Sequence, residues 1–336
     1  MDVQVIEQTC MKMKPNKILE KELEICDAHH HIWDFPTSKY LADELLEDFV
    51  SGHNVTSSVY MECGHAYDTS LPKHLASTGE TKFIENFAEE ILKRTNGDVA
   101  ACKAIVSYTD LCLGSRTQES LEAHLAASNR FCGVRHATGW DADKNIRNAH
   151  TKPTEGLMLT KEFSNGIRAL TKLNLSFDAW LYHPQILEFA TLAKNHPNQI
   201  MVLDHVGGPL GIGRYAGARK LVYEQWKKNI SLLATQENVY VKLGGLAMSI
   251  TGMVNKRLPN IDTIQLAALT APYYLHVIDK FGAERCIFES NFPVDKVGVS
   301  YSTLWNSFKY ITQSFSPSEK LALFKGTAEK IYHSGN

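Results

Sequence analysis

The residues best suited to chemistry form a histidine cluster near the start of the chain, in the segment Asp27–Asp34, which reads DAHHHIWD. A strand-like run leads into it, and alternate residues of a strand point to the same side. His29 and His31 are therefore expected to share a face with Asp27, whereas His30 is expected to face the other way. Two neutral imidazoles at a strand end can hold zinc or a similar ion if other strands add ligands. The alternative is a histidine-rich surface loop.

Two later segments place further polar groups at the ends of apolar runs. The segment IMVLDHVGGP carries Asp204 and His205 directly before a turn, and we interpret His205 as a metal ligand or acid–base group, with a buried structural histidine as the alternative. The segment CIFESNFPVDK carries Glu289 and Asn291 two residues apart, which predicts one shared strand face. A carboxylate in an apolar strand needs a partner or a catalytic purpose.

Other strand ends supply candidate substrate contacts. Arg135, in GVRHATGW, suits a substrate carboxylate because its guanidinium can pair with both oxygens, and a structural ion pair is the alternative. Lys242, in YVKLGG, is either an ion-pair partner or an anion contact. The expected substrate-binding set is Glu62, His65, Arg135, His136, Tyr182 and His183. For His183, capping of the next helix is the alternative role.

The elements that must position these residues are eight strand-like runs, most of them apolar and rich in Val or Ile, that largely alternate with helical patterns. The runs are Leu23–Asp27, Thr56–Glu62, Ala101–Ser107, Cys132–Ala137, Leu175–Leu181, Ile200–His205, Val239–Leu243 and Cys286–Glu289. Near-continuous apolarity suits strands that are covered on both faces, in either an open doubly wound sheet or a closed barrel. No GxGxxG follows the first run, so a dinucleotide-binding fold has no support.

Long polar segments follow several of these runs, and the active sites of barrels are built from such loops. We therefore predict an α/β fold of the (β/α)8 TIM-barrel type. The barrel domain is expected at residues 21–336, with residues 1–20 as a short N-terminal extension.

The composition excludes several classes of protein. The chain has 336 residues, of which 44% are hydrophobic, so it is globular rather than disordered. Its net charge of -2 argues against a nucleic-acid partner or a basic membrane binder. The N-terminus lacks the apolar core of a signal peptide, and the seven cysteines form no CxxC pair. We expect a cytoplasmic protein with a small-molecule substrate, and a homo-oligomer is left open.

These motifs together resemble the amidohydrolase superfamily, which has DxHxH after the first strand, LDHxGxP after the sixth and an xSxFP turn after the eighth. More narrowly, residues 22 to 335 resemble the amidohydrolase-related branch that contains 2-pyrone-4,6-dicarboxylate lactonase and the sugar lactonases. The resemblance implies hydrolysis of a lactone or similar carbonyl ester bond in a small, anionic molecule. It also implies that His29, His31 and His205 line the site where many members hold a divalent metal, with zinc favoured, although several relatives in this branch work without one.

One position departs from the family pattern. The family usually has GSDWP after the eighth strand, with the Asp as general base, and this chain has ESNFP at residues 289–293. The amide of Asn291 cannot accept a proton near neutral pH. Another group must take the proton, or the reaction is not ordinary hydrolysis. Glu289 is the nearest carboxylate on the expected face, and the other candidates are Asp295, Asp204 and Glu62.

Three hypotheses follow. The first is a hydrolase in which the metal or the histidines polarise the carbonyl, water attacks and Glu289 or a substitute takes the proton. Its catalytic set is His29, His31, His205, Glu289 and Asn291. The second is a decarboxylase or other lyase on the same barrel, which would explain the loss of the hydrolytic Asp. The third is a degenerate barrel that binds a small molecule without turnover, and the retained histidines argue against it.

Overall fold

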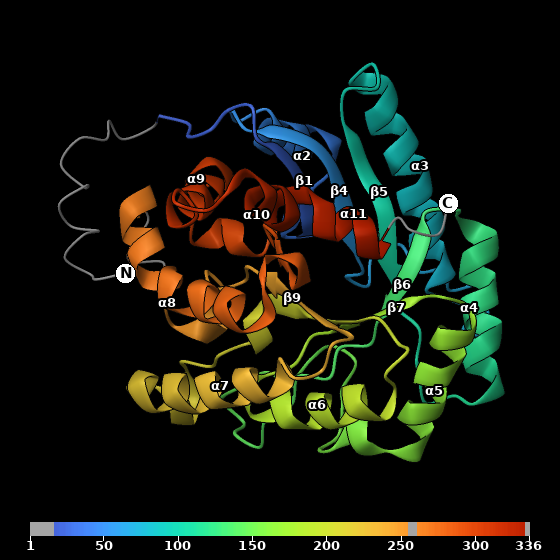
Figure 1. The fold of residues 1–336 in the computed structure, drawn as a ribbon. Helices are drawn as coiled ribbons and strands as arrows, with labels where there is room; N and C mark the ends of the chain where they lie inside the picture. The colour runs from blue at the N-terminus through green and yellow to red at the C-terminus, as the bar shows by residue number, and fades with distance from the viewer. Residues whose placement is uncertain (1–16, 255–260, 333–336) are drawn as a thin grey trace.

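Eight parallel strands form the centre of the protein in a computed structural model that describes residues 17–254 and 261–332 (Figure 1). In order around the sheet they are β1 (Glu24–His30), β4 (Asn54–Met61), β5 (Ala100–Ser107), β6 (Phe131–Arg135), β7 (Ser176–Ala179), β8 (Met201–Leu203), β9 (Val239–Leu243) and β10 (Cys286–Phe288). Each predicted run overlaps one of these strands. The (β/α)8 barrel predicted from the sequence is confirmed.

The sheet closes where the first strand meets the segment that follows the last. Asn291 N donates to His29 O at 2.8 Å, and His31 N donates to Phe292 O at 2.8 Å. His30 also forms a parallel bridge with Phe292. The closure therefore places the histidine cluster beside the ESNFP segment.

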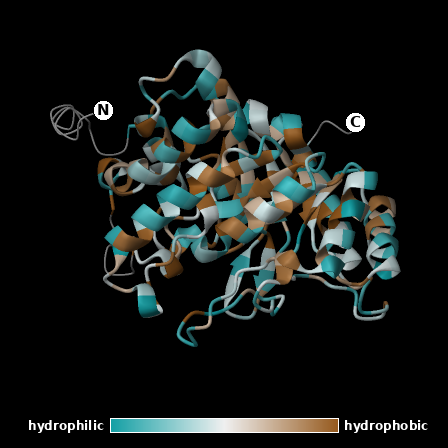
Figure 2. Cartoon of the chain, turned by 60° about the horizontal axis from the view of Figure 1, so that its bottom comes forward, coloured by the Kyte–Doolittle hydropathy of each residue, from teal (hydrophilic) through white to brown (hydrophobic). Residues whose placement is uncertain are grey.

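Helices cover the outside of the barrel. They are α2 (Ala42–Phe49), α3 (Thr78–Arg94), α4 (Ser115–Ala127), α5 (Lys161–Lys172), α6 (Ile186–Asn195), α7 (Arg219–Leu233), α8 (Thr263–Phe281), α9 (Tyr301–Ile311), α10 (Pro317–Leu321) and α11 (Thr327–Tyr332). Figure 2 shows that the outer helices carry both hydrophilic and hydrophobic residues, as expected for amphipathic helices packed on a sheet. Polar side chains begin several of them; Asp262, for example, accepts from the N–H groups of Ile264 and Gln265. None of the helices among the described residues is long and apolar enough to cross a membrane.

The C-terminal helix α11 closes one end of the barrel. Its residues Ala328, Ile331 and Tyr332 pack with inward-facing side chains of the strands, among them Cys26, Val59, Ala104, Val202 and Ile287. Cys132, Ile200 and Tyr240, which lie at or next to the N-terminal ends of their strands, border the same cluster. The apolar filling thus occupies much of the N-terminal end of the barrel, and most of the buried polar groups lie toward the other end.

Most of the predicted N-terminal extension, residues 1–16, lies outside the described residues. Residues 17–20 lie against α9. Leu19 N donates to Asn306 Oδ1 at 2.9 Å, and Lys309 Nζ donates to the carbonyl oxygens of Leu19 and Glu20.

Candidate active site

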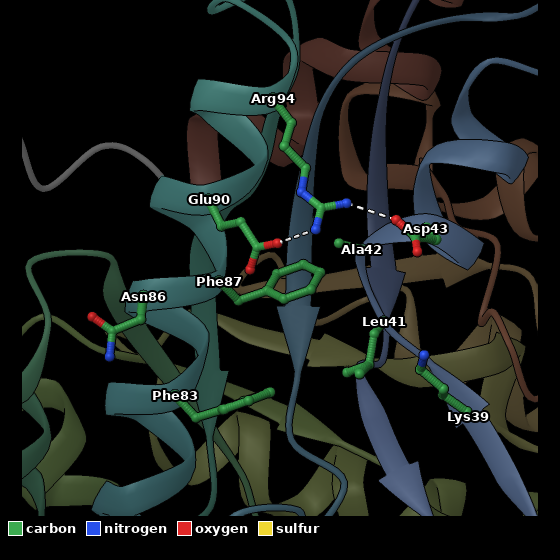
Figure 3. Close-up of a pocket in the computed structure, with 9 residues that line it drawn as sticks. All are labelled: Lys39, Leu41, Ala42, Asp43, Phe83, Asn86, Phe87, Glu90 and Arg94. Atoms are coloured by element: carbon green, nitrogen blue, oxygen red, sulfur yellow. Dashed lines mark hydrogen bonds and ion pairs between the residues drawn. The ribbon is translucent and has the colours of Figure 1, made fainter.

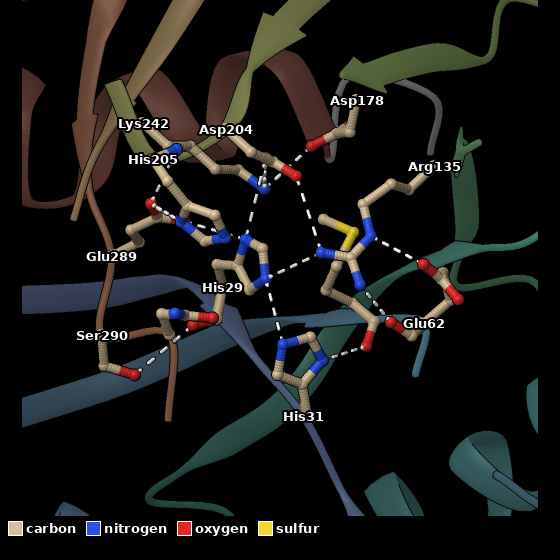
Figure 4. A network of polar contacts seen from close by, with 12 residues as sticks. His29, His31, Glu62, Arg135, Asp178, Asp204, His205, Lys242, Glu289 and Ser290 are labelled. Carbon is tan, nitrogen blue, oxygen red and sulfur yellow. Dashed lines mark hydrogen bonds and ion pairs between the residues drawn. The ribbon is translucent and has the colours of Figure 1, made fainter. Parts of the chain in front are cut away.

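Buried polar side chains from seven of the eight strands converge at the C-terminal end of the barrel (Figure 4). Figure 4 labels His29, His31, Glu62, Arg135, Asp178, Asp204, His205, Lys242, Glu289 and Ser290. All of them are buried. Because a buried charge is costly unless it is paired, the contacts between these groups decide what each can do.

His29 lies at the centre, and its two ring nitrogens face different partners. Nδ1 is 2.8 Å from Glu289 Oε2 and 3.7 Å from Asp204 Oδ1. Nε2 is 3.3 Å from His31 Nε2 and 3.3 Å from Arg135 Nη1. Burial lowers the pKa of His29, which favours the neutral ring. Because a guanidinium can only donate, the contact with Arg135 puts the lone pair on Nε2 and the proton on Nδ1.

His31 turns a lone pair toward His29. Its Nδ1 donates to Met61 O at 2.8 Å, so Nε2 is the acceptor of the neutral ring. Burial holds the pKa of His31 well below its ordinary value, which keeps the ring neutral. Two imidazole lone pairs that face each other are stabilised by a cation between them.

Asp27 was expected to share a face with His29 and His31, and this expectation is wrong. The expectation that His30 faces the other way is confirmed. The register of β1 against β4 shifts between Asp27 and His30, so simple alternation fails there. Asp27 faces α9, where its carboxylate accepts from the hydroxyl of Tyr301 at 3.0 Å. His30 faces away from His29 and bonds Ser58 Oγ at 2.8 Å.

Glu289 bridges two imidazoles. Its Oε1 accepts from Nδ1 of His205 at 2.6 Å, and its Oε2 lies 2.8 Å from Nδ1 of His29. Burial raises the pKa of Glu289, but its interactions with His205 and His29 outweigh burial and lower it to about 2. A carboxylate with such a low pKa stays ionised and orients its partners, and it is a weak base near neutral pH.

A tight turn presents His205 to the site. His205 has φ +54° and Val206 has φ +49°, in the left-handed region that such residues rarely adopt. The ring of His205 also packs closely on Gly245, in the loop that follows β9. A Cβ added to Gly245 would lie 2.5 Å from His205 Cγ. This position therefore requires glycine.

Lys242 is an ion-pair partner, which was one of its two predicted roles. Its Nζ lies 2.8 Å from Asp178 Oδ2 and 3.3 Å from Asp204 Oδ1. Burial lowers the pKa of Lys242, but the two carboxylates outweigh burial and raise it. Burial likewise raises the pKa of Asp204, and Lys242 and His29 outweigh it, so Asp204 stays ionised.

Arg135 is also engaged within the protein. Its Nε donates to Glu62 Oε1 at 2.7 Å, and its Nη2 donates to the backbone oxygen of Glu62. His150 Nε2 lies 3.2 Å from Glu62 Oε2. Burial raises the pKa of Glu62, but Arg135 and His150 outweigh burial and lower it to about 2. The geometry favours the structural ion pair that was the alternative to a substrate clamp.

The expectation that Glu289 and Asn291 share a strand face is wrong. Strand β10 ends at Phe288, and Asn291 has φ +55°, so the alternation of a strand does not reach it. The amide of Asn291 donates to Asp295 Oδ1 at 2.9 Å. Asp295 is buried, and burial raises its pKa to about 7 although the charge of His205 acts in the opposite direction. Asp295 is thus a carboxyl group that can exchange a proton near neutral pH.

The other predicted substrate-binding residues lie outside the central network and contact loops or helix α3. His65 packs edge-on against Phe83. His136 Nδ1 accepts from Leu111 N, His183 Nδ1 accepts from Leu210 N, and the hydroxyl of Tyr182 donates to Arg147 O. Their role in substrate binding stays a prediction, as do the roles assigned to the rest of the set.

Three residues near the network were not among the predicted site residues. Asp178 carried the same signal as Glu289, a carboxylate within an apolar run. Trp180, whose ring centroid is 4.8 Å from that of His205, and His150 carried no signal in the sequence that marks them as site residues.

The donor atoms fit one divalent ion. His29, Asp204 and His205 each place a ligand atom within 4.8 Å of the others, and all three are buried. Neither carboxylate oxygen of Asp204 accepts a hydrogen bond from the described residues, although Oδ1 lies 3.3 Å from Lys242 Nζ in an ion pair. Imidazole and carboxylate ligands suit zinc. The facing lone pairs of His29 and His31 offer a second way to hold an ion. This second arrangement uses Nε2 of His29, which already carries the lone pair, so the proton can stay on Nδ1.

A cavity of about 260 Å³ lies apart from this site, between the β3 end (Ser38–Tyr40), α2 and α3 (Figure 3). Arg94 on its wall pairs with Asp43 at 2.6 Å and Glu90 at 2.5 Å. The guanidinium of Arg94 is therefore satisfied within the protein, Lys39 lies 3.9 Å from Glu44, and we assign no ligand to this cavity.

Comparisons with known proteins agree with the geometry. Residues 26–333 match the family described as Amidohydrolase. An uncharacterized protein of Sinorhizobium fredii is 29% identical over 332 residues, which are 93% of this chain and 99% of that protein. An L-fucono-1,5-lactonase of Burkholderia multivorans is 22% identical over 316 residues, 91% of this chain and 95% of that enzyme. A solved amidohydrolase from Burkholderia multivorans with bound zinc has a TM-score of 0.69 and 20% identity, covering 92% of this chain and 99% of that one.

Proposed function

The chain belongs to the amidohydrolase family, and from this premise we propose that it opens a lactone or a similar carbonyl ester bond in a small molecule by attack of water. The predicted enzyme class, a hydrolase of this superfamily, is confirmed by the family. The observation that carries the finer proposal is the Glu289–His205 pair beside His29, because it supplies an oriented imidazole at the barrel mouth. An anionic substrate remains part of the proposal with Arg135 as its support, and the pairing of Arg135 with Glu62 weakens that support.

His205, rather than Glu289, is the group to which we assign the proton transfer. Because Nδ1 of His205 donates to Glu289, Nε2 is left as the acceptor. Nε2 takes a proton from water as the water oxygen bonds to the lactone carbonyl carbon. The ring C–O bond then breaks, and the leaving oxygen takes the proton back from Nε2. Glu289 stabilises the transient imidazolium, so the products are a hydroxy acid and unchanged enzyme.

Asp295 is the alternative base. Its pKa of about 7 is suited to proton exchange at neutral pH, and Asn291 holds its carboxyl group in place. The single variants His205→Asn and Asp295→Asn separate the two assignments. Loss of turnover in the first with retention in the second supports His205, and the reverse result moves the assignment to Asp295.

One divalent ion, with zinc favoured, would be held through His29 with Asp204 and His205, or with His31 and His205 as the sequence predicted. The neutral ring of His205 has a single lone pair, so with the ion bound to it the proton transfer would fall to Asp295, the alternative base. When bound, such an ion would polarise the lactone carbonyl as a Lewis acid. The chain's own contribution is to keep His29 and His31 neutral by burial, so that their lone pairs are available.

A screen of sugar lactones and pyrone lactones, with acid release followed by a pH indicator, tests the proposal. The wild-type protein is expected to release acid from one of these lactones, and the His205→Asn variant is expected to lose most of this activity. Release of carbon dioxide from a carboxylate substrate without lactone opening would favour the decarboxylase alternative. Saturable binding without any product would favour a degenerate binder.

The cytoplasmic location expected from the sequence remains a proposal. The six cysteines among the described residues carry free thiols, which suits a reducing compartment. A homo-oligomer also remains open, and the proposed partner is a small-molecule substrate.

A further inference from the structure

A continuous series of buried polar contacts crosses the barrel from the candidate site to its opposite end. Nδ1 of His29 lies 3.7 Å from Asp204 Oδ1, and the same oxygen lies 3.3 Å from Lys242 Nζ. Lys242 Nζ lies 2.8 Å from Asp178 Oδ2. That carboxylate oxygen also accepts a hydrogen bond from the hydroxyl of Tyr332. The series therefore joins the centre of the site to the last described residue of α11.

Packing alone does not account for these groups. Asp178, Asp204 and Lys242 are fully buried, and Tyr332 is 3% exposed. The side chains around the lower part of the series are apolar, such as Val202. Replacing a buried ion pair by apolar residues of similar volume is often neutral or stabilising, so stability is a weak reason to keep charges here. A role in holding the site is the stronger reason.

Tyr332 is well placed to hold the lower end of the series. Its ring packs with the apolar filling of the barrel, which fixes the ring plane. Lys242 Nζ lies over this ring, 5.2 Å from its centroid. Tyr332 therefore touches both Asp178 and the ammonium group that Asp178 binds, although it comes from a helix at the end of the barrel opposite the site.

We propose that Tyr332 is a positioning residue of the active site. Its hydroxyl holds the carboxylate of Asp178, Asp178 and Asp204 share the ammonium group of Lys242, and this sharing fixes Asp204 beside His29. Without the hydroxyl, the carboxylate of Asp178 loses one donor, so it binds Lys242 more closely at the expense of Asp204. The kinetic part of this inference rests on the proposed function.

The kinetic test compares two substitutions that each remove one hydroxyl from a tyrosine at the same end of the barrel. Tyr332→Phe removes the donor to Asp178. Tyr240→Phe is the matched control, since Tyr240 lies on β9 two residues before Lys242 and borders the same apolar cluster. We expect Tyr332→Phe to lower kcat about three- to tenfold with KM within about twofold, because the loss concerns the arrangement of catalytic groups rather than substrate affinity. Tyr240→Phe is expected to leave both constants near wild type. Equal kcat values for the two variants would overturn the inference.

A second test needs no substrate. Tyr332→Phe and Asp204→Asn are combined, and the midpoints of thermal unfolding of the single and double variants are compared. Sites that do not interact give additive shifts, whereas members of one network do not. We expect the double variant to depart from the sum of the single shifts by about 2 °C or more, and the pair Tyr240→Phe with Asp204→Asn to be additive.

Additive shifts in both pairs would overturn the inference. A non-additive shift for the pair Tyr332→Phe with Asp204→Asn, together with an additive shift for the control pair, supports the inference. This holds even if the screen finds no lactone that the protein opens. The failure of the proposed function can thus be told apart from the failure of this inference.

Discussion

The Oε1 atom of Glu289 lies 2.6 Å from Nδ1 of His205, although the two residues are 84 positions apart in the chain. Glu289 also accepts from the backbone N–H of His205 at 3.2 Å, so it fixes both the turn and the ring that the turn presents. The LDHxG and ESNFP segments thereby act as one unit. The residue that replaces the family's usual glycine orients an imidazole, and the residue that replaces its aspartate holds another carboxyl group.

Replacing Glu289 by Gln is expected to lower kcat by about 100-fold or more. The amide nitrogen of the new Gln is a donor and would face the Nδ1–H of His205 or of His29. One of the two rings would then have to move its proton from Nδ1 to Nε2, which is the wrong tautomer for catalysis. Steady-state kinetics measure the effect. Glu284→Gln, at an exposed position, is the control and should keep the wild-type rate. A wild-type kcat for Glu289→Gln would show that Glu289 is only structural.

Replacing Asn291 by Asp should destabilise the protein rather than restore a base. It would put a second carboxylate against Asp295, and two buried carboxylates raise each other's pKa. The folded state would then bind protons more tightly than the unfolded state, so stability should fall as the pH rises from about 4 through about 7. Thermal unfolding at pH 5 and pH 8 measures this.

For that variant, the drop in the unfolding midpoint is expected to be larger at pH 8 than at pH 5. The exposed substitution Asn165→Asp is the control and should show no such difference. An equal drop at both pH values would mean that the new carboxylate does not interact with Asp295.

Added zinc should stabilise the protein after treatment with a chelator. An ion that binds only the folded state contributes about 2.7 kcal/mol at a concentration of 100 Kd. The upward shift of the unfolding midpoint should disappear in His29→Asn and persist in His74→Asn, since His74 lies outside the site and pairs with Glu119. Full lactone-opening activity in chelator, with no shift on adding zinc, would instead place this chain among the relatives that work without a metal.

Gly245→Ala should abolish most activity because the new Cβ would displace the ring of His205. Gly217→Ala is the matched control. Both glycines have positive φ, +68° and +77°, but a Cβ on Gly217 would have no heavy atom within 4 Å. The control should show only the backbone strain, about 1 kcal/mol in the free energy of unfolding, with kcat unchanged. Equal activity in the two variants would argue against His205 as the base.

The barrel and the place of the histidines could be predicted because both depend on local pattern. Most strands of the barrel lie in apolar runs, many of them rich in Val or Ile, and His29 and His31 lie at the end of the first such run. Local pattern fails where the backbone is irregular. Asp27 lies next to a register shift, and Asn291 lies after the strand in a left-handed conformation. Neither irregularity is visible in residue type alone.

Partners across the barrel were equally out of reach of the sequence. The pattern placed Lys242 in a buried strand, and it left open whether Lys242 pairs within the protein or binds an anion. Which of the facing strands supplies a carboxylate depends on strand tilt and side-chain length. The ion pairs of Lys242 with Asp178 and Asp204 therefore emerge only from the three-dimensional arrangement.

The closure of the barrel also sets when the site can form during synthesis. Ser290 bonds the carbonyl oxygen of His29 from 261 residues further along the chain. A ribosome has therefore made most of the protein before β1 can acquire its last neighbour, and until then two strand edges stay unpaired. Unpaired edges can join edges of other chains. The half-made chain is thus the form most exposed to aggregation, and it carries the histidines without the carboxylate that orients them.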